Sequence, residues 1–142
     1  MSKPILSELE YNADDVASAI LSTADLSVTN EDLGVTNRNS KFDVDTSFTT
    51  NLLETFGFNG FMFISFYLSH SGGAPDDGTN IIEINDTDFY PSSRVVAPTL
   101  GHQVDYASEI EFKTDGNIRI HNPVDQGSDT YYIVCNAWFR YG

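Results

Sequence analysis

The sequence is poor in cysteine and in basic residues. Its one cysteine, Cys135, excludes an intrachain disulfide, so the fold has to rest on side-chain packing. Seven lysines and arginines stand against 21 aspartates and glutamates, which gives a net charge of −14. Nucleic acids and anionic membranes both attract cationic proteins, so we expect neither as a partner. Solubility alone explains a surface this acidic, and a basic protein partner is the alternative.

Long hydrophobic runs are also missing. No apolar stretch approaches the length of a membrane-spanning helix. The first ten residues contain no continuous apolar region and no cleavage pattern, so we expect no signal peptide. We therefore predict synthesis and folding in a reducing cytoplasm.

Residue patterns typical of metal sites and catalysis are scarce. The histidines, at positions 70, 102 and 121, are too far apart for the usual zinc spacings. Ser71 follows a histidine and precedes two glycines but lacks the glycine spacing of a nucleophile elbow. Segment 76–80 offers calcium-type oxygen ligands, although the same residues are ordinary turn formers. We predict no catalytic residue, no metal and no cofactor, and hence a protein that is not an enzyme.

The chain is instead rich in aromatic and β-branched residues, and its strongest pattern is at 130–142. One face of this stretch carries Tyr131, Ile133, Cys135, Ala137, Phe139 and Tyr141, and the other carries Tyr132, Val134, Asn136, Trp138 and Arg140. This period of two predicts a strand. Because both faces are largely apolar, we expect both to lie inside a sandwich rather than at an edge. Segment 60–70 has the same two apolar faces, which predicts a central or doubly covered strand.

Shorter patterns complete an all-β chain. Strands are predicted within 41–48, at 81–84 and at 94–97, and a hairpin is predicted from 109 to 121 around Asp115-Gly116. Segment 71–80 is predicted as a loop, and 50–54 as a single helical turn before Gly57. Strands at this spacing indicate a jelly-roll-like antiparallel β-sandwich, which we place at residues 25–142.

The N-terminal part has a different character. Residues 1–24 are expected to form an extended arm with a short helix over 13–21, for which Asn12 is the N-cap. A helix this short is marginally stable alone, so it needs a surface to pack on.

Three stretches carry a resemblance to a protein family: the arm Met1–Glu10, the Asn/Thr/Ser/Asp-rich segment 26–39, and the ending Trp138-Phe-Arg-Tyr-Gly142. A short, acidic, cysteine-poor chain with this plan resembles small virion proteins of tailed bacteriophages, most of all head decoration (cement) proteins. The resemblance implies a non-enzymatic virion structural protein, made in the host cytoplasm, that binds the outer surface of a phage capsid and stabilises it.

The same resemblance implies the partners. They would be the major capsid protein and sister subunits in a homo-oligomer, with the arm as the contact. The arm residues expected to bind are Pro4, Ile5, Leu6, Leu9 and Tyr11. Alternatively, the apolar arm residues cover the protein's own sandwich.

Two other functions remain open. A receptor- or glycan-binding knob of a tail fibre predicts that Phe89, Tyr90 and Tyr106 are exposed at loop tips, where they stack on sugars. A small carbohydrate-active hydrolase predicts two carboxylates that flank a sugar-sized cleft, and 21 acidic residues offer many pairs.

Overall fold

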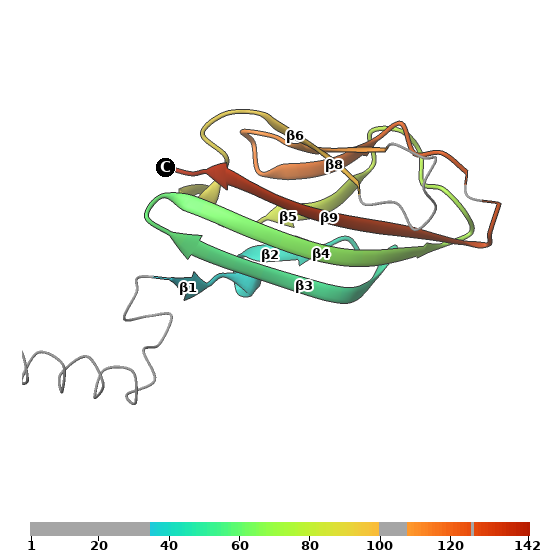
Figure 1. Ribbon diagram of the computed structural model, residues 1–142, viewed down its shortest axis with the longest axis horizontal. Coiled ribbons are helices and arrows are strands. Elements are labelled where there is room, and N and C mark those ends of the chain that lie inside the picture. The colour runs from blue at the N-terminus through green and yellow to red at the C-terminus, as the bar shows by residue number, and fades with distance from the viewer. Residues whose placement is uncertain (1–34, 100–107, 126) are drawn as a thin grey trace, which may run out of the picture. The chain divides into compact units, whose positions relative to one another are not determined.

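The computed structural model describes residues 35–99, 108–125 and 127–142, which form two antiparallel β-sheets (Figure 1). The predicted antiparallel β-sandwich is therefore confirmed. The strands are β1 (Thr36–Asn37), β2 (Phe42–Val44), β3 (Phe48–Phe58), β4 (Phe61–Ser71), β5 (Asn80–Ile84), β6 (Val95–Pro98), β7 (Glu109–Phe112), β8 (Asn117–His121) and β9 (Thr130–Arg140), with 3₁₀ turns η1 (Asn39–Lys41) and η2 (Thr87–Phe89).

The predicted arm at 1–24 lies outside the described residues. So do its helix, its proposed contacts Pro4, Ile5, Leu6, Leu9 and Tyr11, and the loop residue Tyr106. Within the described part of the chain, no helix is long and apolar enough to cross a membrane.

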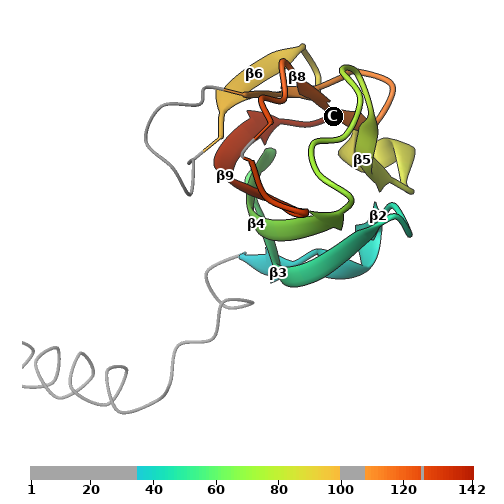
Figure 2. The ribbon, with the colours of Figure 1, turned by 90° about the vertical axis from the view of Figure 1, so that its right-hand side faces the viewer.

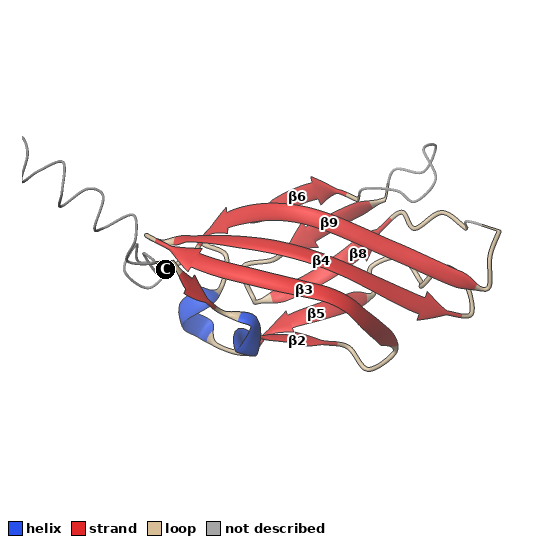
Figure 3. Ribbon diagram, turned by 60° about the horizontal axis from the view of Figure 1, so that its bottom comes forward, coloured by secondary structure: helices blue, strands red, loops and turns tan. Residues whose placement is uncertain are grey.

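The first sheet has the strand order β1-β3-β4-β9, and three of its strands are 11 residues long (Figure 3). The turn Asn59-Gly60 joins β3 to β4, and both residues have positive φ, at 49° and 80°. Consecutive residues of this conformation match the twist of a tight hairpin, and Asn-Gly favours it. On its other side β4 pairs with β9 along its whole length, from Phe61–Arg140 to Ser71–Thr130.

The second sheet has the order β2-β5-β8-β7-β6. Its β7–β8 hairpin turns at Asp115-Gly116, as predicted. Figure 2 shows the layer with β4 and β9 facing the layer with β5, β6 and β8. The inner faces supply the core: Met62, Ile64, Phe66, Leu68, Tyr131, Ile133, Cys135 and Phe139 from one sheet, and Ile82, Ile84, Ile110, Phe112, Ile118 and Ile120 from the other. Phe112 and Phe139 meet between the layers with ring centroids 5.6 Å apart.

The helical turn predicted at 50–54 is wrong, because these residues belong to β3. The pairing of β3 with β4 shifts between Thr50 and Leu52, so a β-bulge interrupts the alternation at Asn51. Beyond the bulge, Leu52 and Leu53 pair in regular register, with Leu52 exposed and Leu53 packed against the core. Gly57, which follows the predicted turn, also lies inside β3, where a Cβ would come within 3.3 Å of the Tyr141 hydroxyl.

The prediction for the last strand is wrong in one respect. β9 is the outermost strand of its sheet, and only one of its faces is buried. Tyr131, Ile133, Cys135, Ala137 and Phe139 point into the core. Asn136, Trp138 and Arg140 are exposed instead of buried. β4 is central, as predicted, but its second face is likewise partly exposed.

Candidate interaction face

The outward side of the four-stranded sheet carries large exposed aromatic residues. The exposed fractions are 63% for Trp138, 49% for Phe58, 42% for Phe63 and 38% for Phe61. With about 200 Å² per aromatic side chain, these four residues present roughly 400 Å² of apolar surface. Continuous apolar patches of this size on a protein surface commonly mark binding sites. We call this side of β3, β4 and β9 the aromatic face.

Strand register sorts the aromatic face into rows that cross the sheet. Phe58, Phe61 and Arg140 are register partners in one row, and the Arg140 guanidinium carbon lies 5.8 Å from the Phe61 ring centroid. The next row joins Phe63 to Trp138 on one side and to Phe56 on the other. The Phe61 and Trp138 rings pack edge to face at 5.6 Å.

These two rows surround a shallow hollow. Its volume is about 440 Å³, and it is lined by Val35, Phe56, Phe58, Phe61, Phe63 and Trp138. All of the lining residues are apolar. The hollow can therefore hold an apolar surface but offers no side-chain hydrogen bond of its own.

Hydrogen-bonding groups lie in the following row. Glu54, Ser65 and Asn136 are register partners across β3, β4 and β9, and we call them the polar row. The Ser65 hydroxyl donates to Asn136 Oδ1 at 2.6 Å, which orients the amide. With about 4.8 Å between strands, the Glu54 and Asn136 backbones are roughly 10 Å apart, with Ser65 between them.

Another apolar row lies on the far side of the polar row. Leu52, Tyr67 and Val134 are register partners there, and Leu52 is 41% exposed. The Tyr67 and Tyr132 rings lie 5.8 Å apart. The polar row is therefore flanked by ring-bearing rows on both sides.

This alternation suits a saccharide. A sugar ring has an apolar C–H side, which is attracted to the negative face of an aromatic ring, and a rim of hydroxyl groups that need hydrogen-bonding partners. Ligand sites commonly combine apolar and aromatic walls with a few fixed polar groups. The aromatic face supplies both on one surface.

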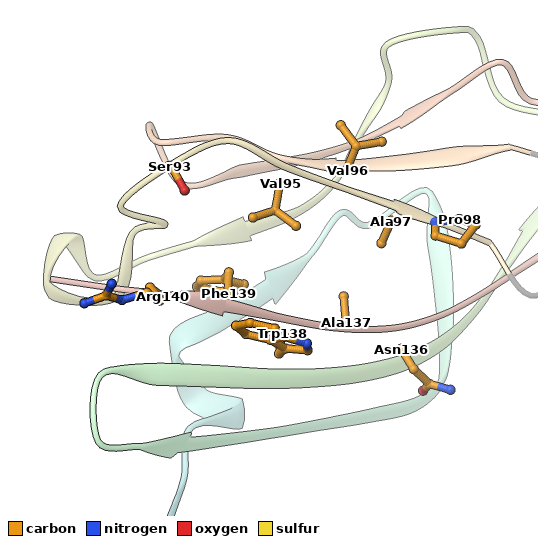
Figure 4. Close-up of a pocket in the computed structure, with 10 residues that line it drawn as sticks. All are labelled: Ser93, Val95, Val96, Ala97, Pro98, Asn136, Ala137, Trp138, Phe139 and Arg140. Carbon is orange, nitrogen blue, oxygen red and sulfur yellow. The ribbon is translucent and has the colours of Figure 1, made fainter.

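A second hollow, of about 490 Å³, lies between the outermost strands β6 and β9 (Figure 4). Val95 and Ala97 from β6 and Ala137 from β9 line it, and their small side chains leave the space between the two sheets open at this side. In Figure 4, Trp138 lies on the other side of the β9 ribbon from Ala137. Trp138 borders both hollows.

The five-stranded sheet carries a network of ionisable side chains on its outer side. Glu111 accepts hydrogen bonds from Arg94 and from His121 Nε2, the latter at 2.5 Å, and His121 Nδ1 lies 3.4 Å from Asp77 Oδ1. The hydrogen bond from His121, followed by that from Arg94, lowers the pKa of Glu111. A backbone hydrogen bond from Asn122 is the main cause of the lowered pKa of Asp77. No group of three or more potential metal ligands was found among the described residues.

The residues that a glycan-binding knob was expected to expose are partly packed away. Phe89 contacts Tyr141 edge to face at 5.2 Å, and the Arg38 guanidinium carbon lies 4.9 Å from its ring centroid. Tyr90 packs against Gly116. Both rings support the core from its margin, so the exposed aromatic surface lies on a sheet and not at these loop tips.

Side chains of the types used in catalysis have structural roles at His70 and Cys135. His70 Nδ1 lies 2.8 Å from the Gly73 carbonyl oxygen, and its ring packs on Phe48 at 5.0 Å. Cys135 is fully buried, and burial raises the pKa of its thiol to about 12. Ser71 is the last residue of β4, next to the loop that contains Gly73.

The period of two placed Trp138, Phe61 and Phe63 in strands and predicted that they lie in the interior. One signal could have located the face. Asn59-Gly60 between two aromatic segments predicts a tight hairpin, and a hairpin places Phe58 beside Phe61 and Phe56 beside Phe63.

Comparisons with known proteins give information on the fold alone. No protein-family model matches the chain, and no curated protein matches it. Among solved structures, the chain is similar to the receptor binding protein (gp15) of Listeria phage PSA, with 14% sequence identity and a TM-score of 0.53. The match covers 94% of this chain and 78% of that protein. The β-sandwich of this chain is thus a fold that also occurs in a phage receptor binding protein.

Proposed function

We propose that this protein is a receptor-binding protein of a bacteriophage virion, associated with the tail, and that its aromatic face holds a saccharide of the host surface. The observation that carries the proposal is the pairing of exposed rings with hydrogen-bonding side chains on one sheet face, Phe63 and Trp138 beside Ser65 and Asn136. The similarity to the Listeria phage protein supports the same assignment, because the fold extends over nearly the whole chain.

The decoration hypothesis explains less. It relied on an arm that lies outside the described residues. It also gives no reason for a polar row between two apolar rows on an open sheet face. Binding to capsids that lack the protein remains its direct test. Homo-oligomerisation and the absence of enzymatic activity stay predictions under either function.

The proposed function is tested by binding the purified protein to host cells and to saccharides released from their surface. Trp138→Ala and Phe63→Ala should each weaken binding about tenfold, since one lost stacking contact is worth about 1 kcal/mol or more. An excess of the wild-type protein should also block adsorption of the phage that carries it.

Val124→Ala is the matched control. Val124 is 38% exposed, the same as Phe61, but lies in the loop between β8 and β9 and lines neither hollow. Its substitution should leave binding unchanged. Equal binding by wild type and both aromatic variants would overturn the aromatic face as the site, and no binding of wild type to any host-surface saccharide would overturn the function.

A further inference from the structure

The charges around the polar row indicate which class of saccharide the aromatic face can bind. Glu54 is exposed in the middle of β3 and faces outward, next to Ser65. A carboxylate accepts hydrogen bonds from two neighbouring hydroxyl groups, and an amide NH₂ donates to a hydroxyl oxygen. The hydrogen bond from Ser65 to Asn136 Oδ1 fixes the orientation of the amide, so the amide NH₂ of Asn136 is the side-chain donor that can serve a ligand.

We infer, on the basis of the proposed function, that the aromatic face selects an uncharged saccharide with vicinal hydroxyl groups, which Glu54 and Asn136 bind from the two sides of the polar row, and that it rejects phosphate-rich polymers. The carboxylate of Glu54 would lie beside any group bound over Ser65. A phosphate there would meet a like charge.

The rest of the protein strengthens this selection. Across the rows that join β3, β4 and β9 on the aromatic face, Arg140 and Glu54 are the charged residues, so the face has no cluster of cations for a polyanion. The whole chain carries a net charge of −14, which repels polyanions at long range. Proteins that bind phosphate polymers neutralise them with several lysines or arginines instead.

A second copy of the chain is a poorer occupant of the same face. Two copies would each bring the same strong negative charge, and contact through the face would cover the polar row with another protein's Phe and Trp side chains. Buried polar groups without partners are unfavourable by about 1–3 kcal/mol each. A saccharide supplies hydroxyl groups at that place.

The experiment compares three immobilised probes: an array of uncharged bacterial oligosaccharides, the same array after periodate oxidation, and poly(glycerol phosphate). Periodate cleaves vicinal diols and leaves isolated hydroxyl groups intact. Wild type should bind the untreated array equally well at low and high salt, and should lose binding to the oxidised array.

Two variants test the roles of Glu54 and Asn136 in binding. Glu54→Gln keeps a hydrogen-bond acceptor but removes its charge, and Asn136→Ala removes the amide donor. Each substitution should weaken binding about five- to tenfold. For Glu54 this is the difference between a charged and a neutral hydrogen bond, and for Asn136 it is the loss of one hydrogen bond. Glu83→Gln, at an exposed carboxylate of β5, is the control and should bind like wild type.

Each outcome separates the inference from the function on which it rests. Binding to poly(glycerol phosphate) that weakens with salt and strengthens in Glu54→Gln would overturn the inference and leave receptor binding intact. Saccharide binding that resists periodate, or that Glu54→Gln leaves unchanged, would also overturn it. Binding to no probe and to no host cell would overturn the proposed function itself.

Discussion

Tyr90 lies directly on Gly116, so closely that a Cβ at position 116 would come within 2.4 Å of Tyr90 Cε1. Gly116 has a φ of +85° in the turn between β7 and β8, a conformation unfavourable for residues with a side chain. We predict that Gly116→Ala lowers the free energy of unfolding by about 3 kcal/mol, since about 1–2 kcal/mol of backbone strain adds to the overlap with the Tyr90 ring.

Gly78→Ala isolates the contribution of the ring. Gly78 has a nearly identical φ of +80°, but a Cβ at this position would have open space around it, with no atom beyond its chain neighbours within 4 Å. Its substitution should lower the unfolding free energy by about 1–2 kcal/mol only. Urea unfolding of both variants measures the difference, and equal losses would argue against the Tyr90 contact.

Trp138 offers a direct optical readout of the aromatic face. It is the one tryptophan of the sequence and is 63% exposed. We predict strong quenching of its fluorescence by acrylamide in the unliganded protein, and protection with a blue shift when a saccharide binds. A Trp138 already protected in the unliganded protein at low concentration would be incompatible with an open face.

Glu111 should make stability depend on pH on the acid side. Hydrogen bonds from His121 and Arg94 lower its pKa in the folded protein from the ordinary 4.5, so the unfolded chain takes up the proton first as the pH falls. The stabilisation by Glu111 is therefore present above pH 4.5 and is lost as the pH falls below it. We predict that Glu111→Gln destabilises at pH 7, and that the difference from wild type shrinks on acidification.

Glu109→Gln is the control for the pH dependence of the Glu111→Gln variant. Glu109 is in the same strand but is exposed, and no ion pair or side-chain hydrogen bond of Glu109 was found among the described residues. Thermal unfolding from pH 3 to pH 7 (roughly the range over which carboxylates titrate) should give it the profile of wild type. If Glu111→Gln also followed wild type at every pH, the network would have no net stabilising role.

Cys135 should be inert in the folded protein. Burial raises the pKa of its thiol to about 12, and the thiolate is the reactive form. A thiol reagent at pH 8 (about half a unit below the pKa of an exposed thiol) should modify it only as fast as the protein unfolds. Rapid labelling without loss of structure would contradict its burial.

The same residue predicts a loss of stability in alkali. Above pH 9.0 the unfolded chain releases the Cys135 proton while the folded protein keeps it, until about pH 12. Stability should therefore fall by up to about 1.4 kcal/mol per pH unit in that window. Cys135→Ala removes this term, so its stability should decline less steeply above pH 9.0.

Several strands of the fold could be predicted from the sequence because short-range signals specified them. Asp115-Gly116 indicated the β7–β8 hairpin, and the alternation around Ile64 and Ile133 indicated two long strands. The helical turn predicted at 50–54 was wrong because the bulge between Thr50 and Leu52 breaks the alternation that would have indicated a strand there. Pairing with β4 along the whole strand outweighs that local irregularity.

The candidate site could not be predicted in the same way. Apolar residues on both faces of a strand normally indicate burial on both faces, so Phe63 and Trp138 were assigned to the interior. Their exposure depends on β9 being the outermost strand and on the second sheet covering one side only, which is information about strand order. The polar row is also invisible in the sequence, because Glu54, Ser65 and Asn136 become neighbours only through register.

The topology of β4 has a consequence for how ligand binding and folding are coupled. Phe61 pairs with Phe58 across a tight turn on one side and with the distant Arg140 on the other. Contacts between residues so far apart in sequence form slowly, because the intervening chain must first be closed into a loop. The polar row is complete only once β9 has joined, so a saccharide that bridges it binds the finished fold and stabilises that state, by about 2.7 kcal/mol at a hundredfold excess over its Kd. Heat resistance gained on adding a glycan would therefore report the attachment of β9 as well as the occupancy of the face.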